Sequence, residues 1–158
     1  MIVTAVHINA MIREMAVLFQ DEAGASAISI RTELAAGLPD VIADRIQLQQ
    51  VFMNLVLNAI EAMKGTGGEL TITSQMREES ELLIEVSDTG VGLPADNPEQ
   101  IFESFVTTKP HGTGMGLAIT RSIVESHGGR LWAISNTGPG ATFLFTLLTE
   151  AAAPRPSP

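Results

Sequence analysis

The clearest pattern in the chain is a long helical one that begins after Asp44 and ends before the glycine-rich segment 64–69. Its apolar side chains cover most of the helix surface at the 100° spacing of an α-helix. What remains is one narrow polar stripe, with members three or four residues apart: Gln47, Gln50, Asn54, Asn58 and Glu61. Buried amides require hydrogen-bond partners, so the stripe is expected to contact another segment or a ligand. Bracing of a neighbouring element is the more ordinary of these two explanations.

The other periodic segments predict an α+β fold. Two further helices are expected over 9–22, with Asn9 as N-cap, and over 115–127, before two glycines. Strand-like segments are 27–34, 69–76, 81–88, 130–136 and 141–148. Because helices and strands are interleaved and hairpins recur, we expect a layer of helices on a mixed sheet.

Two segments lack this periodicity. Residues 89–116 are rich in glycine and proline, and a loop that long inside a compact domain is unusual and often functional. The tail 150–158 is rich in alanine and proline and is expected to be disordered. The sequence therefore predicts one domain over 1–149.

Composition excludes several classes of protein. With 158 residues, 45% of them apolar, the chain can bury a real core as one domain. It has no cysteine, which excludes disulfides, thiolate metal sites and a cysteine nucleophile, and its three histidines are too scattered for a zinc site. No apolar run approaches the roughly 20 residues of a membrane helix, and no secretory signal is visible. We expect a soluble, cytoplasmic domain.

The net charge of −9 narrows the partners. It argues against a nucleic-acid-binding surface and against attraction to an anionic membrane. It leaves open an anion held locally, because a helix N-terminus and one lysine bind phosphate against the overall field.

Gly112, Gly114 and Gly116 lie where the helix over 115–127 begins. Glycine allows close approach of the backbone to a ligand, and the free amides of a first helical turn favour an anion such as phosphate. Taken alone, this pattern is equally typical of a flexible hinge. It is neither a Rossmann turn, because no strand immediately precedes it, nor a P-loop, because the Gly-Lys-Ser/Thr ending is missing.

Asp88 follows a predicted strand and precedes Gly90 and Gly92 in the stretch VSDTGVGLP. A carboxylate there can accept a hydrogen bond from an exocyclic amine, and the glycines leave room for a flat ring. An ordinary turn is the simpler explanation. The triplet Asp-Thr-Gly also occurs in aspartic proteases, but this chain has only one such triplet and at least three helices, which disfavours that class.

Residues 101–110, IFESFVTTKP, combine apolar and phosphate-binding side chains. Phe102 and Phe105 are suited to anchor a flap to the core. Thr107, Thr108 and Lys109 are able to reach phosphate oxygens.

The order of these four stretches resembles the catalytic ATP-binding domain of bacterial sensor histidine kinases. NLVLNA (54–59), DTGVG (88–92), FESFVTTK (102–109) and GTGMG (112–116) correspond to the N, G1, F and G2 boxes of that family. The similarity continues through 122–147, so it covers nearly the whole chain except the tail. NAIEAM and FVTTK are most similar to the nitrogen-regulation and oxygen-sensing kinases of the GHKL superfamily.

This resemblance implies a fold, two ligands and a set of site residues. The fold is the Bergerat-type two-layer α/β sandwich, with a mixed sheet, three helices and ATP beneath a mobile lid. Asn58 corresponds to the Mg²⁺ ligand, Asp88 to the adenine anchor, and Asn54, Asn58 and Lys109 to the catalytic residues. The other implied nucleotide contacts are Gly90, Gly92, Thr107, Thr108, Lys109, Gly112, Gly114, Gly116, Leu117 and Thr142, the last through a water at the adenine.

The sequence departs from the family pattern in two respects. Many relatives have a basic residue three positions after the metal asparagine, where this chain has Glu61. No phosphoacceptor box surrounds His7, His111 or His127, so the substrate histidine is expected on a dimerisation domain outside this chain. A response regulator is the expected onward partner, and this chain is expected to be monomeric.

Other functions remain as alternatives. ATP-hydrolysing clamps of the gyrase B, MutL and heat-shock type share the sandwich, but they have a glutamate base where this chain has Asn54, which cannot deprotonate water. A stand-alone anti-sigma serine kinase and a nucleotide-binding pseudokinase are two further alternatives.

Overall fold

The long helix predicted from the apolar pattern is the centre of the fold. The computed structural model describes residues 2–78, 80–94, 98–102 and 116–149, and in it α3 spans Arg45–Ala62. The side chain of Asp44 caps this helix, because its carboxylate accepts the backbone N–H of Gln47 at 3.1 Å. Its buried residues are Leu48, Val51, Phe52, Leu55, Val56, Ala59 and Ile60.

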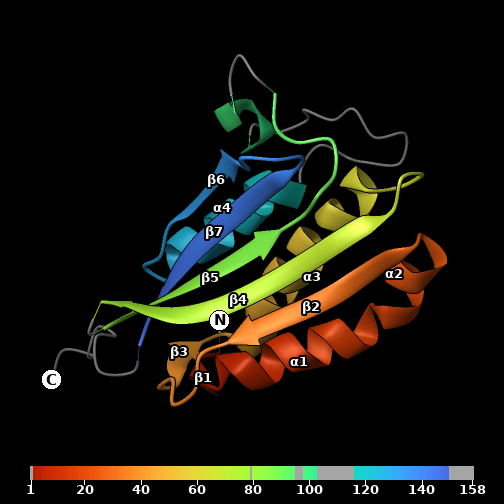
Figure 1. Ribbon diagram of the computed structural model, residues 1–158. Helices are drawn as coiled ribbons and strands as arrows, with labels where there is room; N and C mark the ends of the chain where they lie inside the picture. The colour runs from red at the N-terminus through yellow and green to blue at the C-terminus, as the bar shows by residue number, and fades with distance from the viewer. Residues whose placement is uncertain (1, 79, 95–97, 103–115, 150–158) are drawn as a thin grey trace, which may run out of the picture.

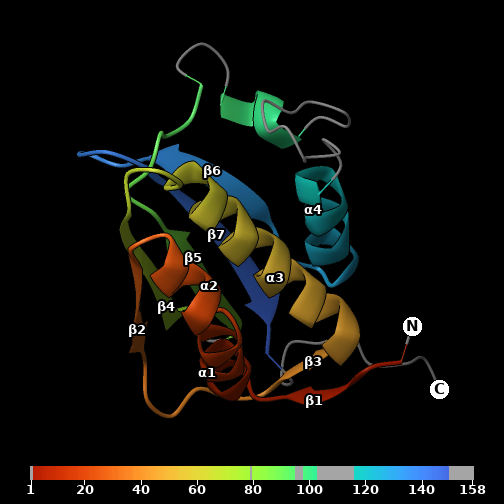
Figure 2. The same cartoon turned by 90° about the vertical axis from the view of Figure 1, so that its right-hand side faces the viewer.

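A mixed five-stranded sheet forms the second layer, which confirms the predicted fold class (Figure 1). Its strands, in spatial order, are β2 (Ile28–Leu34), β4 (Gly68–Glu78), β5 (Glu81–Ser87), β7 (Ala141–Leu148) and β6 (Leu131–Ser135). Only the β2–β4 pair is parallel, and the other three pairs are antiparallel. The helices gather on one face of this sheet (Figure 2). Phe52 of α3 packs edge-on against Phe145 of β7, with ring centroids 5.4 Å apart.

The N-terminal helix differs from the prediction. The structure divides it into α1 (Ile8–Leu18) and α2 (Gln20–Ala25), which meet at Phe19. Asn9 is not the N-cap, a position taken by His7, but lies inside α1 and is buried. Its amide donates to the carbonyl of Ala35 at 2.8 Å and accepts the Ser74 hydroxyl at 2.6 Å. These tertiary hydrogen bonds satisfy both ends of the amide, which explains why Asn9 is buried rather than capping.

Two short strands escaped the sequence pattern. β1 (Thr4–Val6) and β3 (Val41–Ala43) pair antiparallel in a sheet of their own. Three residues are too few to show alternation, so periodicity does not detect such strands.

Within the described residues, no helix has the length and apolar character needed to cross a membrane.

The last helix, α4 (Gly116–Ser126), packs against α3 and also contacts the short turn at Pro98–Phe102. Part of the predicted loop is a 3₁₀ turn, η1 (Pro98–Phe102). Phe102 is buried there, edge-on to Phe143 of β7 with ring centroids 6.1 Å apart. Arg121 of α4 lies over the Phe102 ring at 4.4 Å and pairs with Glu99 at 2.8 Å. Phe102 is therefore anchored in the core, as the sequence predicts, whereas Phe105, the second predicted anchor, lies outside the described residues.

The far end of α4 is joined to the start of α3 by His127. Its Nε2 accepts the backbone N–H of Asp44 at 3.1 Å, and its Nδ1 lies 2.8 Å from the carbonyl oxygen of Ile123. The first contact requires a lone pair on Nε2 and the second a proton on Nδ1, so these contacts select one neutral tautomer.

On the helix-free face of the sheet, the guanidinium groups of two arginines lie over the ring of Trp132 of β6. The guanidinium carbons of Arg77 and Arg130 are 5.5 and 5.1 Å from its ring. Leu131 and Ala133 on either side face the core, so strand alternation places Trp132 on the opposite face.

Candidate functional site

Asp88 lies directly after β5, in the middle of the sheet, and is only 2% exposed. Its backbone N–H donates to the carbonyl of Ala141 at 2.9 Å. Its carboxylate accepts the N–H groups of Gly90 at 2.9 Å and Ala141 at 3.4 Å. A buried carboxylate held by backbone donors is a fixed hydrogen-bond acceptor, as the predicted anchor requires.

The loop after Asp88 rests on the C-terminal end of α3. The N–H of Val91 donates to the carbonyl of Ala62 at 3.1 Å, and a Cβ at Gly90 would overlap that same carbonyl group. Gly92 has a φ of +81°, which favours glycine. Because Ala62 follows Asn58 by one helical turn, the loop 88–92 and Asn58 are neighbours along α3.

Asn54 supports the bracing explanation of the polar stripe. Its side-chain amide donates to the Thr120 hydroxyl at 2.9 Å, and that hydroxyl donates to the carbonyl of Gly116 at 2.6 Å. Thr120 is fully buried, so this bridge fixes the first turn of α4 against α3. Asn58 is half-buried one turn further along, and Glu61 pairs with Lys64 at 3.4 Å.

At the start of α4 the structure reaches only part of the predicted phosphate segment. Gly116 is the first residue of α4 and is exposed, and Leu117 packs against the core. The remaining predicted contacts lie outside the described residues: Thr107, Thr108, Lys109, Gly112 and Gly114.

The structure does not bring Thr142 to this group, which corrects its predicted role at the base. Phe143 and Phe145 point to the helices, where they meet Phe102 and Phe52, so alternation along β7 places Thr142 on the helix-free face. Its hydroxyl lies 2.9 Å from that of Ser87, its cross-strand partner, and donates to Asn136. The β7 residue that touches the Asp88 carboxylate is instead Ala141, through its backbone.

Sequence reasoning missed three residues around this site. Ala141 acts through its main chain, so no side-chain pattern identifies it. Thr120 lies within a helical pattern, and Asn136 lies in the turn between β6 and β7, where asparagine is common for local reasons. The sequence does offer one weak sign for Thr120, since it lies four residues after Gly116 and thus above it on one helix face.

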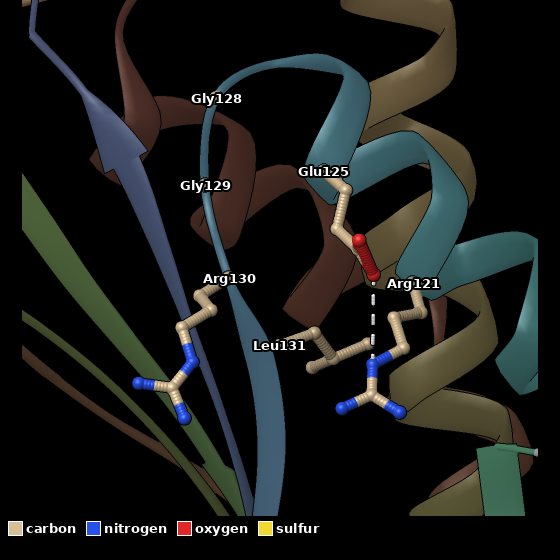
Figure 3. A pocket seen from close by; sticks show the side chains of 6 residues that line it. All are labelled: Arg121, Glu125, Gly128, Gly129, Arg130 and Leu131. Atoms are coloured by element: carbon tan, nitrogen blue, oxygen red, sulfur yellow. Dashed lines mark ion pairs between the residues drawn. The ribbon is translucent and has the colours of Figure 1, made fainter.

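An open surface pocket among the described residues lies elsewhere, near the C-terminal end of α4 (Figure 3). Its lining residues are Arg121, Glu125, Gly128, Gly129, Arg130 and Leu131. The Arg121 Nε is 3.6 Å from the Glu125 carboxylate, so these charges already offset each other. None of the predicted site residues lines this pocket, and we take Asp88 as the centre of the candidate site because it is buried and held by backbone donors.

Comparison with known proteins gives the same picture. Residues 43–151 match the family model described as histidine kinase-, DNA gyrase B- and HSP90-like ATPase. Sensor protein FixL of Bradyrhizobium diazoefficiens is 48% identical over 121 residues, which are 76% of this chain and 24% of FixL. The chain thus spans about a quarter of the length of that relative.

Solved structures show the same similarity. A nucleotide-free catalytic domain of histidine kinase ThkA has a TM-score of 0.84 and 37% identity, covering 94% of this chain and 99% of that one. Histidine kinase ThkA in complex with the response regulator protein TrrA gives 0.79 and 33%, covering 93% of this chain and 42% of that one.

Proposed function

The chain belongs to the family of histidine kinase-, DNA gyrase B- and HSP90-like ATPases, and on that premise we propose that it is the ATP-binding catalytic domain of a sensor histidine kinase. It binds ATP with Mg²⁺ in the cytoplasm and transfers the γ-phosphoryl group to a histidine on a dimerisation domain outside this chain. A response regulator then receives the phosphoryl group, as the complex of ThkA with TrrA suggests.

The observation that carries this proposal is the buried, backbone-held carboxylate of Asp88. An ionised carboxylate only accepts hydrogen bonds, so it matches the exocyclic amine of adenine. Gly90 lets this loop lie against Ala62, one turn beyond Asn58. The proposed base anchor and the proposed metal ligand are thus adjacent, as a single nucleotide requires.

Position 54 favours phosphoryl transfer over ATP hydrolysis. An amide cannot take a proton from water, and the Asn54 amide is already bound to Thr120. We therefore expect slow hydrolysis, which disfavours the clamp ATPases of the same family. In transfer to histidine the acceptor nitrogen is itself the nucleophile, so positioning and charge stabilisation supply most of the rate.

The side chains present are compatible with Mg²⁺ held jointly with a nucleotide. Among the described residues, no group of three or more His, Cys, Asp or Glu side chains could bind a metal alone. Mg²⁺ is bound at such sites by one or two protein oxygens together with phosphate oxygens and waters. The amide oxygen of Asn58 would hold it, and the ion would offset the charge of the phosphates.

The phosphate contacts are proposed from the family pattern. Gly112, Gly114, Gly116 and Leu117 would present backbone amides, and Thr107, Thr108 and Lys109 would contact phosphate oxygens from the lid. The Asn54 bridge supports this arrangement, because it fixes the first turn of α4 directly after that segment.

Calorimetric titration with ADP, with and without Mg²⁺, tests the proposal through Asp88→Asn. The substitution keeps the size of the side chain but puts an N–H₂ donor where an acceptor is required. We expect affinity to fall by about 10- to 100-fold, the equivalent of one charge-assisted hydrogen bond.

Asp40→Asn provides the matched control, since Asp40 is a carboxylate outside the site that pairs with His7 at 3.2 Å. It should bind ADP like the wild type. Equal affinity of Asp88→Asn and the wild type would refute the base-anchor role.

A further inference from the structure

Asn136, in the turn between β6 and β7, makes a side-chain contact with the backbone of Asp88. Its Nδ2 donates to the carbonyl of Asp88 at 2.8 Å and to that of Pro139 at 3.2 Å. Its Oδ1 accepts the Thr142 hydroxyl at 2.6 Å. Because both carbonyls can only accept, this environment fixes which end of the amide faces Asp88.

The cluster lies behind the site, on the helix-free face of the sheet. Thr142 and Ser87 are cross-strand partners on that face, with hydroxyls 2.9 Å apart. Gly140 makes the close approach possible, since it has a φ of +95° and a Cβ there would overlap the Asp88 carbonyl. Asn136 thus reaches Asp88 from the side opposite to α3.

The backbone N–H, the carboxylate and the backbone carbonyl of Asp88 each make hydrogen bonds, but to different kinds of partner. Its N–H and its carboxylate are bound by the backbone of Ala141 and Gly90, which no substitution removes without moving the chain. Its carbonyl is bound by the side chain of Asn136. Asn136 is therefore a position at which a side-chain change can loosen Asp88.

We propose that Asn136 is a positioning residue that sharpens selection of a 6-aminopurine over a 6-oxopurine nucleotide by clamping the Asp88 carbonyl. The inference rests on the proposed function, in which the Asp88 carboxylate accepts the 6-amino group. A 6-oxo group is itself an acceptor and is disfavoured opposite a carboxylate. That discrimination depends on a carboxylate that cannot turn away, because small displacements relieve the mismatch.

The same geometry assigns Thr142 a secondary role. Its only proton is given to Asn136, and its side chain faces away from the helices. Loss of the Thr142 hydroxyl removes one contact of the clamp but leaves the bond from Asn136 to Asp88 in place.

The experiment compares the affinities for ADP and inosine diphosphate (IDP), a 6-oxopurine nucleotide, by calorimetry. Asn136→Asp keeps the acceptor for Thr142 but removes the donor to Asp88, and Asn136→Ala removes both. Thr142→Val removes the hydroxyl with little change of volume. Thr137→Ala, an exposed position in the same turn, is the matched control. Thermal unfolding of each variant identifies any that fail to fold.

In both Asn136 variants we expect the preference for ADP over IDP to fall by about fivefold or more. In Thr142→Val and Thr137→Ala it should stay within about twofold of the wild-type preference. A merely structural role would weaken both nucleotides by one factor and leave the ratio unchanged, and that result would overturn the inference. So would a Thr142→Val variant that loses as much selectivity as the Asn136 variants.

Different results refute the Asn136 clamp and the proposed function. A wild type that binds ADP through Asp88, combined with unchanged selectivity in the Asn136 variants, refutes the clamp alone. A wild type that binds neither nucleotide refutes the proposed function and the clamp with it.

Discussion

Asp44 shows how one residue serves several segments. Its carboxylate accepts the N–H of Gln47 at 3.1 Å and that of Ile2 at 3.2 Å, while its own N–H donates to His127. The hydrogen bond from the Gln47 backbone lowers the pKa of the Asp44 carboxyl from its usual value, more than desolvation raises it. The ionised form therefore stabilises the folded state.

The sign of that shift predicts a pH dependence. A carboxyl whose pKa is depressed on folding contributes stability above its unfolded pKa and loses it as pH falls through the folded pKa. Asp44→Asn retains a capping side chain without the charge. We expect the difference in thermal midpoint between wild type and variant to change steadily between about pH 6 and pH 2, with the wild type losing more. A difference that is constant over this range would contradict the prediction.

At the scale of elements, a polar contact at each end of α4 joins this helix to α3. Asn54, Thr120 and Gly116 form one, and Asp44, His127 and Ile123 form the other. Apolar packing alone allows two helices to slide by small amounts, whereas hydrogen bonds with fixed partners set one register. The first contact explains why this largely apolar helix carries asparagine at position 54.

Thr120→Val tests the first of these contacts. The change is nearly isosteric but leaves the Asn54 amide and the Gly116 carbonyl without their shared hydroxyl. We expect a loss of about 1–2 kcal/mol in the free energy of unfolding, measured by urea denaturation. Thr120→Ser keeps the hydroxyl and should retain most of this stability.

A double-mutant cycle with Asn54→Ala completes the test. Because the two side chains share one hydrogen bond, their effects should be less than additive by about 0.5 kcal/mol or more. Strictly additive losses would show that the bridge does not couple the two helices.

At the scale of the whole molecule, the proposed function assigns the phosphoacceptor histidine to a domain outside this chain. Asn58→Ala should keep the ADP affinity measured without Mg²⁺, because Asp88 is unchanged. Transfer of labelled phosphate from ATP to an added dimerisation domain of the same kinase should slow by about 100-fold or more, because losing even a group that only supports a metal ligand costs about 10- to 100-fold. Transfer at the wild-type rate would exclude Asn58 as the metal ligand.

Much of the fold was predictable from sequence because long elements repeat their pattern many times. The helix after Asp44 and all five strands of the sheet were found to within a few residues. The strand Thr4–Val6 was not, because it depends on pairing with the distant Val41–Ala43 rather than on local periodicity. The break at Phe19 was also missed, because the apolar spacing continues across it.

In the candidate site, too, local patterns were predictable and features that depend on tertiary contacts were not. The pattern of glycines and Asp88 identified the loop that the structure places against α3. Thr142 was misplaced because a family motif gives a residue type at a position, whereas its side of the sheet follows from the register with β5. Asn136 was missed because asparagine is common in turns for local reasons, whether or not its side chain contacts another segment.

The indole of Trp132, which is in contact with Arg77 and Arg130, gives the molecule an optical reporter of its own. The chain has one tryptophan and no tyrosine, so its intrinsic fluorescence comes essentially from this single ring. The ring sits on β6, the strand that leads directly into the turn of Asn136. Light emitted by the unlabelled protein therefore originates four residues from the asparagine that holds Asp88.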